Sequence, residues 1–104
     1  MSMWASHAIG KLLERIETQV TPHGNSMNPK VKSGQTVTLS PYSDERNPEV
    51  GDIVLCRVKG SIYLHLIKAT RSTGANTQYQ IGNNRGGING WTSTLYGYVT
   101  KIED

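Results

Sequence analysis

Two residues of this chain, Ser26 and His65, have side chains suited to acyl-transfer chemistry. A serine hydroxyl is a weak nucleophile until a neighbouring base accepts its proton. A neutral imidazole can act as that base near neutral pH, because its unperturbed pKa is about 6.5. Each residue also has a simpler interpretation, Ser26 as the cap of a turn and His65 as a structural residue of a strand. Only the fold can bring the two together.

The residues around Ser26 predict a loop that presents backbone donors. Gly24 and Asn25 precede the serine, and Met27 follows it. The amide N–H of Ser26 is a natural donor to an oxyanion, with a further donor expected from Gly24-Asn25. Gly24 would allow the backbone to approach a substrate closely. Met27 is expected to line the core or a substrate pocket rather than to react.

The other chemically versatile residues do not form a recognisable site. His7, His23 and His65 lack the spacing of metal ligands, and Cys56 has no cysteine partner. The sequence therefore predicts neither a metal site nor a cofactor. Residues 83–91 are rich in glycine but lack the order of a phosphate-binding motif. Cys56 lies in an apolar segment, so we expect it to be buried and unreactive.

The length and composition of the chain predict one small β domain. Its 104 residues suit a single domain with a thin core. The hydrophobic fraction is 36%, there is no phenylalanine, and 11 glycines and 4 prolines are present. This mixture favours short strands joined by many turns over a bundle of helices.

The net charge, the single cysteine and the lack of a long apolar stretch indicate which partners and which location to expect. The formal net charge is +3, without a run of like charges, which does not favour a nucleic-acid surface. A single cysteine cannot form an internal disulfide, and this favours a reducing compartment. No stretch reaches the ~20 apolar residues of a membrane span, and the first residues lack a signal-peptide pattern. We therefore expect a soluble, cytoplasmic protein without a transmembrane anchor.

Residues 4–20 predict an N-terminal amphipathic helix. One helical row carries Trp4, Ala8, Leu12, Ile16 and Gln19. Thr21-Pro22 ends the helix, because a residue before proline is disfavoured in the α region. Such a helix could pack on its own domain or on a partner, including a second copy of the chain. The predicted division is a helix at 1–20 and a β domain at 21–104.

The rest of the chain predicts a mainly β fold. Strands are predicted at 35–42, 51–58, 61–70, 78–82 and 94–102. Lys59-Gly60 predicts a two-residue hairpin turn, and 71–77 predicts a longer one. Residues 83–92 predict a Gly/Asn-rich loop, and Asp52 is expected to be a turn residue. About five short strands and one helix favour a small curled sheet or a partly open β-barrel.

Several short segments follow one another in an order that resembles a known superfamily. The segments are Gly24-Asn25-Ser26-Met27 with Pro29, Gly34-Gln35, Gly51-Asp52-Ile53-Val54, the hairpin strand with His65, Gly82-Asn83-Asn84 and Gly97-Tyr98-Val99. Residues 20–102, which span this ordered set, resemble the serine peptidases that include signal peptidases and LexA-like self-cleaving repressors. The resemblance implies a β fold of the LexA/signal-peptidase type.

The resemblance also implies roles for individual residues. Ser26 takes the position of the nucleophile and His65 that of the general base, as in archaeal and endoplasmic-reticulum signal peptidases. LexA-like repressors and bacterial signal peptidases have lysine at the base position. Lys68 is a poor substitute for His65, because strand alternation places it on the opposite face. The His-type enzymes have aspartates where this chain has Asn83 and Asn89, which could orient an imidazole but cannot stabilise imidazolium by charge.

Three functions follow as expectations. The first is a soluble serine endopeptidase with a Ser–His dyad, acting on a peptide or protein bound in extended form beside a strand. The second is a catalytically weak or inactive module of the same fold that serves peptide docking or dimerisation in a phage or regulatory system. The third is a nucleic-acid-associated protein, whose binding would weaken steeply with salt.

Overall fold

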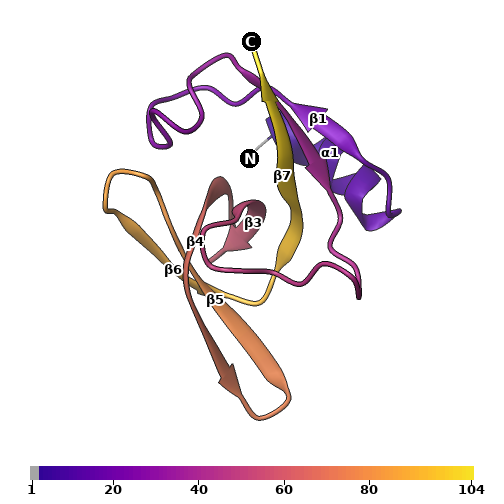
Figure 1. The fold of residues 1–104 in the computed structure, drawn as a ribbon, viewed down its shortest axis with the longest axis vertical. Helices are drawn as coiled ribbons and strands as arrows, with labels where there is room; N and C mark the ends of the chain where they lie inside the picture. Colours follow the sequence, from indigo (N-terminus) through magenta and orange to yellow (C-terminus); the bar gives the residue numbers. More distant parts are fainter. Residues whose placement is uncertain (1–2) are drawn as a thin grey trace.

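The computed structural model describes residues 3–104 as one open, seven-stranded antiparallel sheet with one short helix (Figure 1). The elements are α1 (Met3–Leu13), β1 (Thr18–Val20), β2 (Thr36–Ser40), β3 (Ile53–Val58), β4 (Ser61–Thr73), β5 (Asn76–Gly82), β6 (Ile88–Thr92) and β7 (Leu95–Glu103). The strand order is β1-β2-β7-β3-β4-β5-β6. The predicted mainly β class is therefore confirmed.

The N-terminal helix is shorter than the predicted 4–20. It ends at Leu13, and the chain reverses through Arg15, which has a left-handed φ of 67°. The N–H of Ile16 donates to the carbonyl of Lys11, and the N–H of Arg15 donates to that of Leu12. These two bonds form a Schellman cap, which satisfies the last helical carbonyls. The helix prediction was wrong beyond this point because an apolar row does not reveal a left-handed cap.

The residues after the cap belong to the sheet. Gln19, expected on the helical row, lies in β1 opposite Thr38 of β2, and Val20 pairs with Val37. The predicted boundary between a helix at 1–20 and a β domain at 21–104 is therefore wrong at β1. Pairing with β2 satisfies the backbone groups of Thr18–Val20 in place of the internal hydrogen bonds that a longer helix would form.

Helix α1 packs on its own sheet. Its Ala5, Ala8 and Leu12 are buried in one core cluster with residues of β1, β2, β3 and β4. A β-carbon on Gly97 of β7 would lie 3.0 Å from Leu12 Cδ2 and 2.7 Å from the carbonyl oxygen of Ser40. Glycine at this position therefore permits the close approach of helix and strand. The sequence left open whether the helix packs on its own domain or on a partner. In the structure it packs on its own domain.

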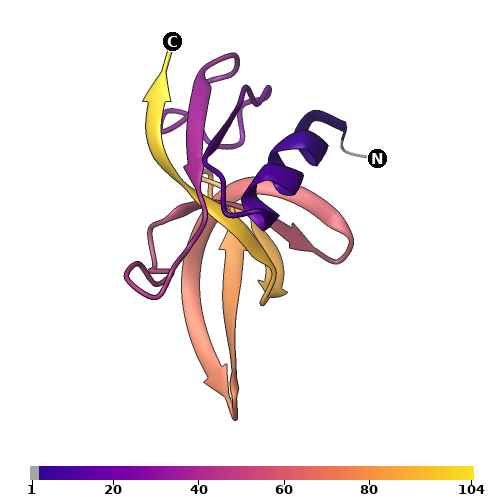
Figure 2. The same cartoon turned by 90° about the vertical axis from the view of Figure 1, so that its right-hand side faces the viewer.

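At the β6 edge of the sheet, the strands are longer and more numerous than predicted. The hairpin of β4 and β5 pairs up to Thr73 and Asn76, so the turn predicted over 71–77 is only two residues long. Its tip projects away from the body and is exposed (Figure 2). The loop predicted over 83–92 contains strand β6. Glycine and asparagine weaken a strand pattern, but backbone pairing with β5 stabilises this segment.

The Lys59-Gly60 turn is confirmed. Val58 pairs with Ser61, and the two turn residues have φ values of 50° and 86°. Positive φ at both central residues matches the right-handed twist of the flanking strands. This turn fixes the register of β3 against β4 and sets His65 opposite Val54. The position of His65 is thereby tied to the central strands.

The sheet is curled so strongly that β6 approaches β3. Thr92 Oγ1 of β6 donates to the carbonyl oxygen of Arg57, at 2.7 Å. The strands in between are β4 and β5. Strands twist with a fixed hand, and bulges increase that twist locally. Register shifts leave one extra residue in β4, between Ile67 and Ala69, and one in β6, between Ile88 and Gly90.

Apolar side chains pack on both faces of the sheet. The cluster under α1 includes Met27, Val37, Leu39, Leu55 and Leu64. The opposite cluster contains Val54, Cys56, Val58, Ile67 and Ile81, with tyrosines around it. Leu55 belongs to one cluster and its neighbours Val54 and Cys56 to the other, as strand alternation requires. Within residues 3–104 no helix is long and apolar enough to cross a membrane.

Asp52, predicted as a turn residue, organises the loop before β3. Its carboxylate accepts hydrogen bonds from Tyr42 Oη at 2.7 Å, from the Glu49 N–H at 3.0 Å, and from both terminal nitrogens of Arg46 at 2.8 and 3.1 Å. Arg46 also lies over the ring of Tyr98 on β7, 4.5 Å from its centroid. Burial alone would raise the pKa of Asp52, but these donors outweigh burial and lower it.

We expect Asp52→Asn to lower the free energy of unfolding by about 1–3 kcal/mol at pH 7, because the partly buried donors Tyr42 and Arg46 would lose a charged acceptor. Urea denaturation followed by circular dichroism would measure the change. Since folding lowers the pKa of Asp52, its stabilisation should be present above the ordinary carboxyl pKa and should vanish as pH falls through the folded value. The matched control is Asp44→Asn, at an exposed position of the same loop. Equal effects of the two substitutions would contradict the assignment.

Candidate active site

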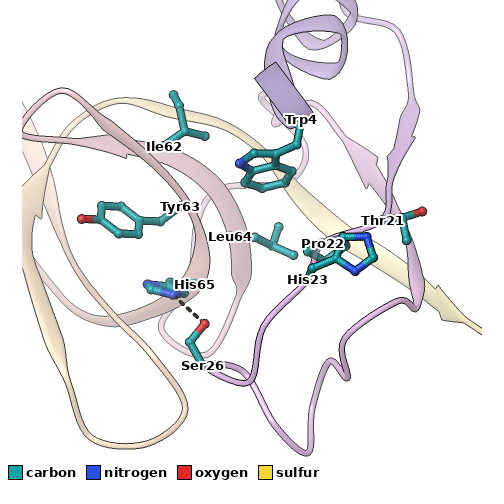
Figure 3. A pocket seen from close by; sticks show the side chains of 9 residues that line it. All are labelled: Trp4, Thr21, Pro22, His23, Ser26, Ile62, Tyr63, Leu64 and His65. Atoms are coloured by element: carbon teal, nitrogen blue, oxygen red, sulfur yellow. Dashed lines mark hydrogen bonds between the residues drawn. The ribbon is translucent and has the colours of Figure 1, made fainter. Parts of the chain in front are cut away.

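The structure joins Ser26, His65 and Asn89 in one line of hydrogen bonds. Ser26 Oγ lies 3.1 Å from His65 Nε2 (Figure 3). On the other side of the ring, Nδ1 lies 2.6 Å from Asn89 Oδ1. These distances are within the reach of a nucleophile, its base and an orienting group. The three residues come from the β1–β2 loop, from β4 and from β6.

Asn89 reaches the imidazole from a bulged strand. Ile88 pairs with Gly82 and Gly90 pairs with Ile81, so Asn89 is an extra residue between two ladder positions. A β-bulge of this kind turns the side chain of the extra residue out of the regular alternation. Strand β5 ends at Gly82, opposite Leu66, so no β5 residue pairs with His65. Because β5 ends there, the side chain of His65 on β4 can form its hydrogen bond with Asn89 on β6.

The bond to Asn89 fixes the tautomer of His65. An amide oxygen can only accept, so the ring proton resides on Nδ1. The lone pair of Nε2 then faces the Ser26 hydroxyl, which donates to it. This is the arrangement that a general base requires. The ring of Tyr63 stacks on the imidazole, with centroids 5.0 Å apart, and restricts the ring's orientation further.

Burial sets the charge state of the imidazole. His65 is 8% exposed. Its pKa is lowered because burial penalises imidazolium, and the hydrogen bond to Asn89 offsets part of this effect. At neutral pH the ring is therefore the unprotonated base. The same burial makes imidazolium costly, and a neutral amide opposes that cost less than a carboxylate would.

Asn84 holds the serine loop against the β5–β6 loop. Its backbone N–H donates to the carbonyl oxygen of Ser26, and its Nδ2 donates to that of Asn28, both at 2.9 Å. Below the loop, Met27 and Val31 are buried in the core. The sequence placed Met27 in the core or a pocket and assigned no role to Asn84. The position of Asn84 in the Gly82-Asn83-Asn84 segment was the only sequence signal for this role. Its acceptors are backbone carbonyls, which a sequence pattern does not identify.

The donors around Ser26 differ from those expected. The amide of Gly24 donates to Ser33 Oγ at 3.1 Å, so Gly24 does not offer a free donor to an oxyanion. Its φ of 115° is a conformation that glycine adopts without strain, and this φ accounts for glycine here. Within residues 3–104 no acceptor is found for the amides of Asn25 and Ser26. These two N–H groups remain as candidate oxyanion donors.

Asn83 does not contact His65. Its Oδ1 accepts the backbone N–H groups of Arg85 at 2.8 Å and Gly87 at 2.9 Å. Its own N–H donates to the carbonyl oxygen of Gly87. Asparagine often forms such local turns. Of the two asparagines considered as orienting groups, Asn83 therefore shapes the loop and Asn89 meets the imidazole.

The remaining candidates lie outside the site. The alkyl chain of Lys68 lies beside Gly82, where an added β-carbon would be 3.1 Å from its Cε. Cys56 is buried, and burial raises the pKa of its thiol to about 12. The thiolate needed for reaction is therefore scarce. No cluster of three or more His, Cys, Asp or Glu side chains suited to a metal occurs in the described part of the chain.

Comparison with known proteins gives no relatives. No protein-family model, curated protein or solved structure matches this chain at a significant level. The assignment of chemistry to the site therefore depends on the geometry of Ser26, His65 and Asn89.

The identity of residue 89 should control both the pH profile and the rate of reaction at Ser26. Asn89→Asp places a carboxylate beside Nδ1, which would raise the pKa of His65 and stabilise imidazolium. We expect the midpoint of the profile to move to higher pH and the plateau rate of labelling at Ser26 to rise by ~10-fold or more. Asn89→Ala should move the midpoint to lower pH and slow the reaction.

Phosphonylation of Ser26 by a fluorophosphonate, followed by intact-protein mass spectrometry from pH 5 to 9, would provide both quantities. The control is Asn83→Asp, which adds the same charge to a side chain that does not touch His65. If Asn89→Asp and Asn83→Asp gave the same midpoint and plateau, residue 89 would not act through the base.

Proposed function

We propose that this protein is a serine peptidase of the signal-peptidase/LexA-like type that cleaves a peptide bound in extended form. The observation that carries the proposal is the continuous line of hydrogen bonds from Ser26 Oγ through His65 to Asn89 Oδ1. A capping serine or a structural histidine does not require this alignment. The ordered motifs along residues 20–102 and the single open sheet with one helix support the same family type.

The proposed reaction is acyl transfer in two steps. Ser26 Oγ bonds to the carbonyl carbon of the scissile amide as its proton passes to His65 Nε2. The amides of Ser26 and Asn25 can donate to the oxyanion that forms. The tetrahedral intermediate collapses when imidazolium gives its proton to the leaving amine, which departs and leaves an acyl-serine ester. Water then attacks the ester, with His65 again accepting the proton, and releases the acid and free serine.

The neutral amide at residue 89 predicts a slow enzyme. Asn89 holds the correct tautomer, but it lacks the charge that stabilises imidazolium in a Ser–His–Asp triad. Burial of His65 lowers its pKa and so weakens it as a base. The protein should therefore form an acyl-serine, but more slowly than an enzyme with a carboxylate at this position.

The neutral amide of Asn89 also favours the second candidate. This is a module with the peptidase fold that docks peptides or dimerises without turnover. In that case the line of bonds would fix the loops and would not transfer protons. The two candidates differ in one property, the reactivity of Ser26 compared with other serines. We propose a reducing, cytoplasmic location for either, given the lone buried Cys56.

Labelling with a fluorophosphonate tests the proposal directly. The Ser26 oxygen would bond to phosphorus, fluoride would leave, and His65 would accept the hydroxyl proton before passing it to solvent. We expect one adduct, located at Ser26 by peptide mapping, and a rate that rises with pH through the pKa of His65, below its ordinary value of about 6.5. Above that pH the base is unprotonated and the rate should be constant.

Ser26→Ala should abolish labelling, and His65→Ala should reduce the rate by about 10²-fold or more. Matched controls are Ser93→Ala and His7→Ala, which change an exposed serine and an exposed histidine outside the site. Labelling that is no faster than that of Ser26→Ala at every pH would reject the peptidase and leave the docking module.

A further inference from the structure

A cavity opens directly beside the Ser26 hydroxyl (Figure 3). Its volume is about 300 Å³, and its lining includes Ser26 and His65 themselves. Binding sites for small molecules span about 300–1,000 Å³, so this cavity is at the lower limit. A cavity of this size has room for any single amino-acid side chain. A group held in it would lie next to the nucleophile.

The walls of the cavity are mainly apolar. Trp4, Pro22, Ile62 and Leu64 line it together with the ring of Tyr63. No aspartate, glutamate, lysine or arginine lines the cavity, and its ionisable side chains are the tyrosine and two histidines. A charged group that entered would lose water without gaining a partner of opposite charge, which is unfavourable. An apolar side chain would instead gain from burial.

Trp4 forms the wall that α1 contributes. It is 43% exposed, although the next residue, Ala5, is completely buried under the helix. The indole faces the cavity across from Leu64 of β4 (Figure 3). A large apolar side chain with an open face is accounted for if the substrate covers it. The helix predicted as a docking element therefore also provides part of a site.

We propose that this cavity is the specificity pocket of the peptidase and accepts an uncharged apolar side chain adjacent to the scissile bond. This inference rests on the proposed function. Trp4 is then a specificity-determining residue outside the Ser–His–Asn line. A substrate side chain covering Trp4 would also position the peptide carbonyl near Ser26 Oγ.

A panel of four acetylated amino-acid diphenyl phosphonates, with alanine, leucine, lysine and glutamate side chains, tests the pocket. In each reaction Ser26 Oγ bonds to phosphorus and phenoxide leaves, while His65 accepts the hydroxyl proton. We expect the leucine probe to label Ser26 at least ~10-fold faster than the lysine and glutamate probes. Trp4→Ala should reduce the leucine-to-alanine rate ratio by ~5-fold, with little change for the alanine probe.

Leu13→Ala is the matched control, because Leu13 is also an exposed apolar residue of α1 but does not line the cavity. Thr21→Lys is a second test that leaves the core unchanged, since Thr21 is exposed and lines the cavity. An ammonium group there should raise the rate of the glutamate probe relative to the lysine probe.

The outcomes separate this inference from the proposed function. Equal rates for the four probes, with Ser26 still labelled by the fluorophosphonate, would overturn the assignment of the specificity pocket. The proposed peptidase function would stand. An equal effect of Trp4→Ala and Leu13→Ala would overturn the role of Trp4. If neither the phosphonates nor the fluorophosphonate label Ser26, the peptidase fails and the pocket assignment fails with it.

Discussion

The contact between the β1–β2 loop and the β5–β6 loop is the constraint on which the site depends. Asn84 provides it with two hydrogen bonds to carbonyl oxygens of the serine loop. The serine loop is anchored from below by Met27 and Val31, and the other loop begins at the end of β5. Together with this anchor, the contact fixes the position of Ser26 relative to His65. The curl of the sheet makes the contact geometrically accessible, because it returns β6 toward β3.

The electrostatics of the site follow from its burial. Burial favours the neutral form of His65, and the amide oxygen of Asn89 selects the tautomer that faces Ser26. Both effects prepare a base in its ground state. Neither provides the negative charge that would stabilise imidazolium once the proton has moved. The site is thus well organised before the proposed reaction and weakly supported during it, so the proposed acyl transfer should be slow.

The charged groups of the fold have a separate, structural use. Arg46 and Asp52 form an ion pair at 2.8 Å that fastens the loop before β3 to the tyrosines of the sheet. This arrangement stabilises the start of β3, and β3 sets the register of β4 and hence of His65. The cavity next to Ser26 has no such ion pairs and is apolar. The ion pair that stabilises the fold and the proposed substrate pocket therefore involve different residues.

The sequence alone determined the β class, the Lys59-Gly60 hairpin and the two residues with the right chemistry, Ser26 and His65. These features depend on local alternation, turn chemistry and side-chain type. The end of α1 at Leu13, strand β1 and strand β6 were not predictable, because a left-handed cap and backbone pairing with distant strands decide them.

The tertiary structure alone decided which asparagine meets the imidazole. Asn83 and Asn89 are equivalent by residue type, but Asn83 forms a local turn, whereas a bulge directs Asn89 toward Nδ1. It also decided that the Gly24 amide is occupied and that Trp4 borders the cavity. Residue types determine which chemistry is available. Only packing and long-range hydrogen bonding determine which groups meet, because both depend on residues far apart in the chain.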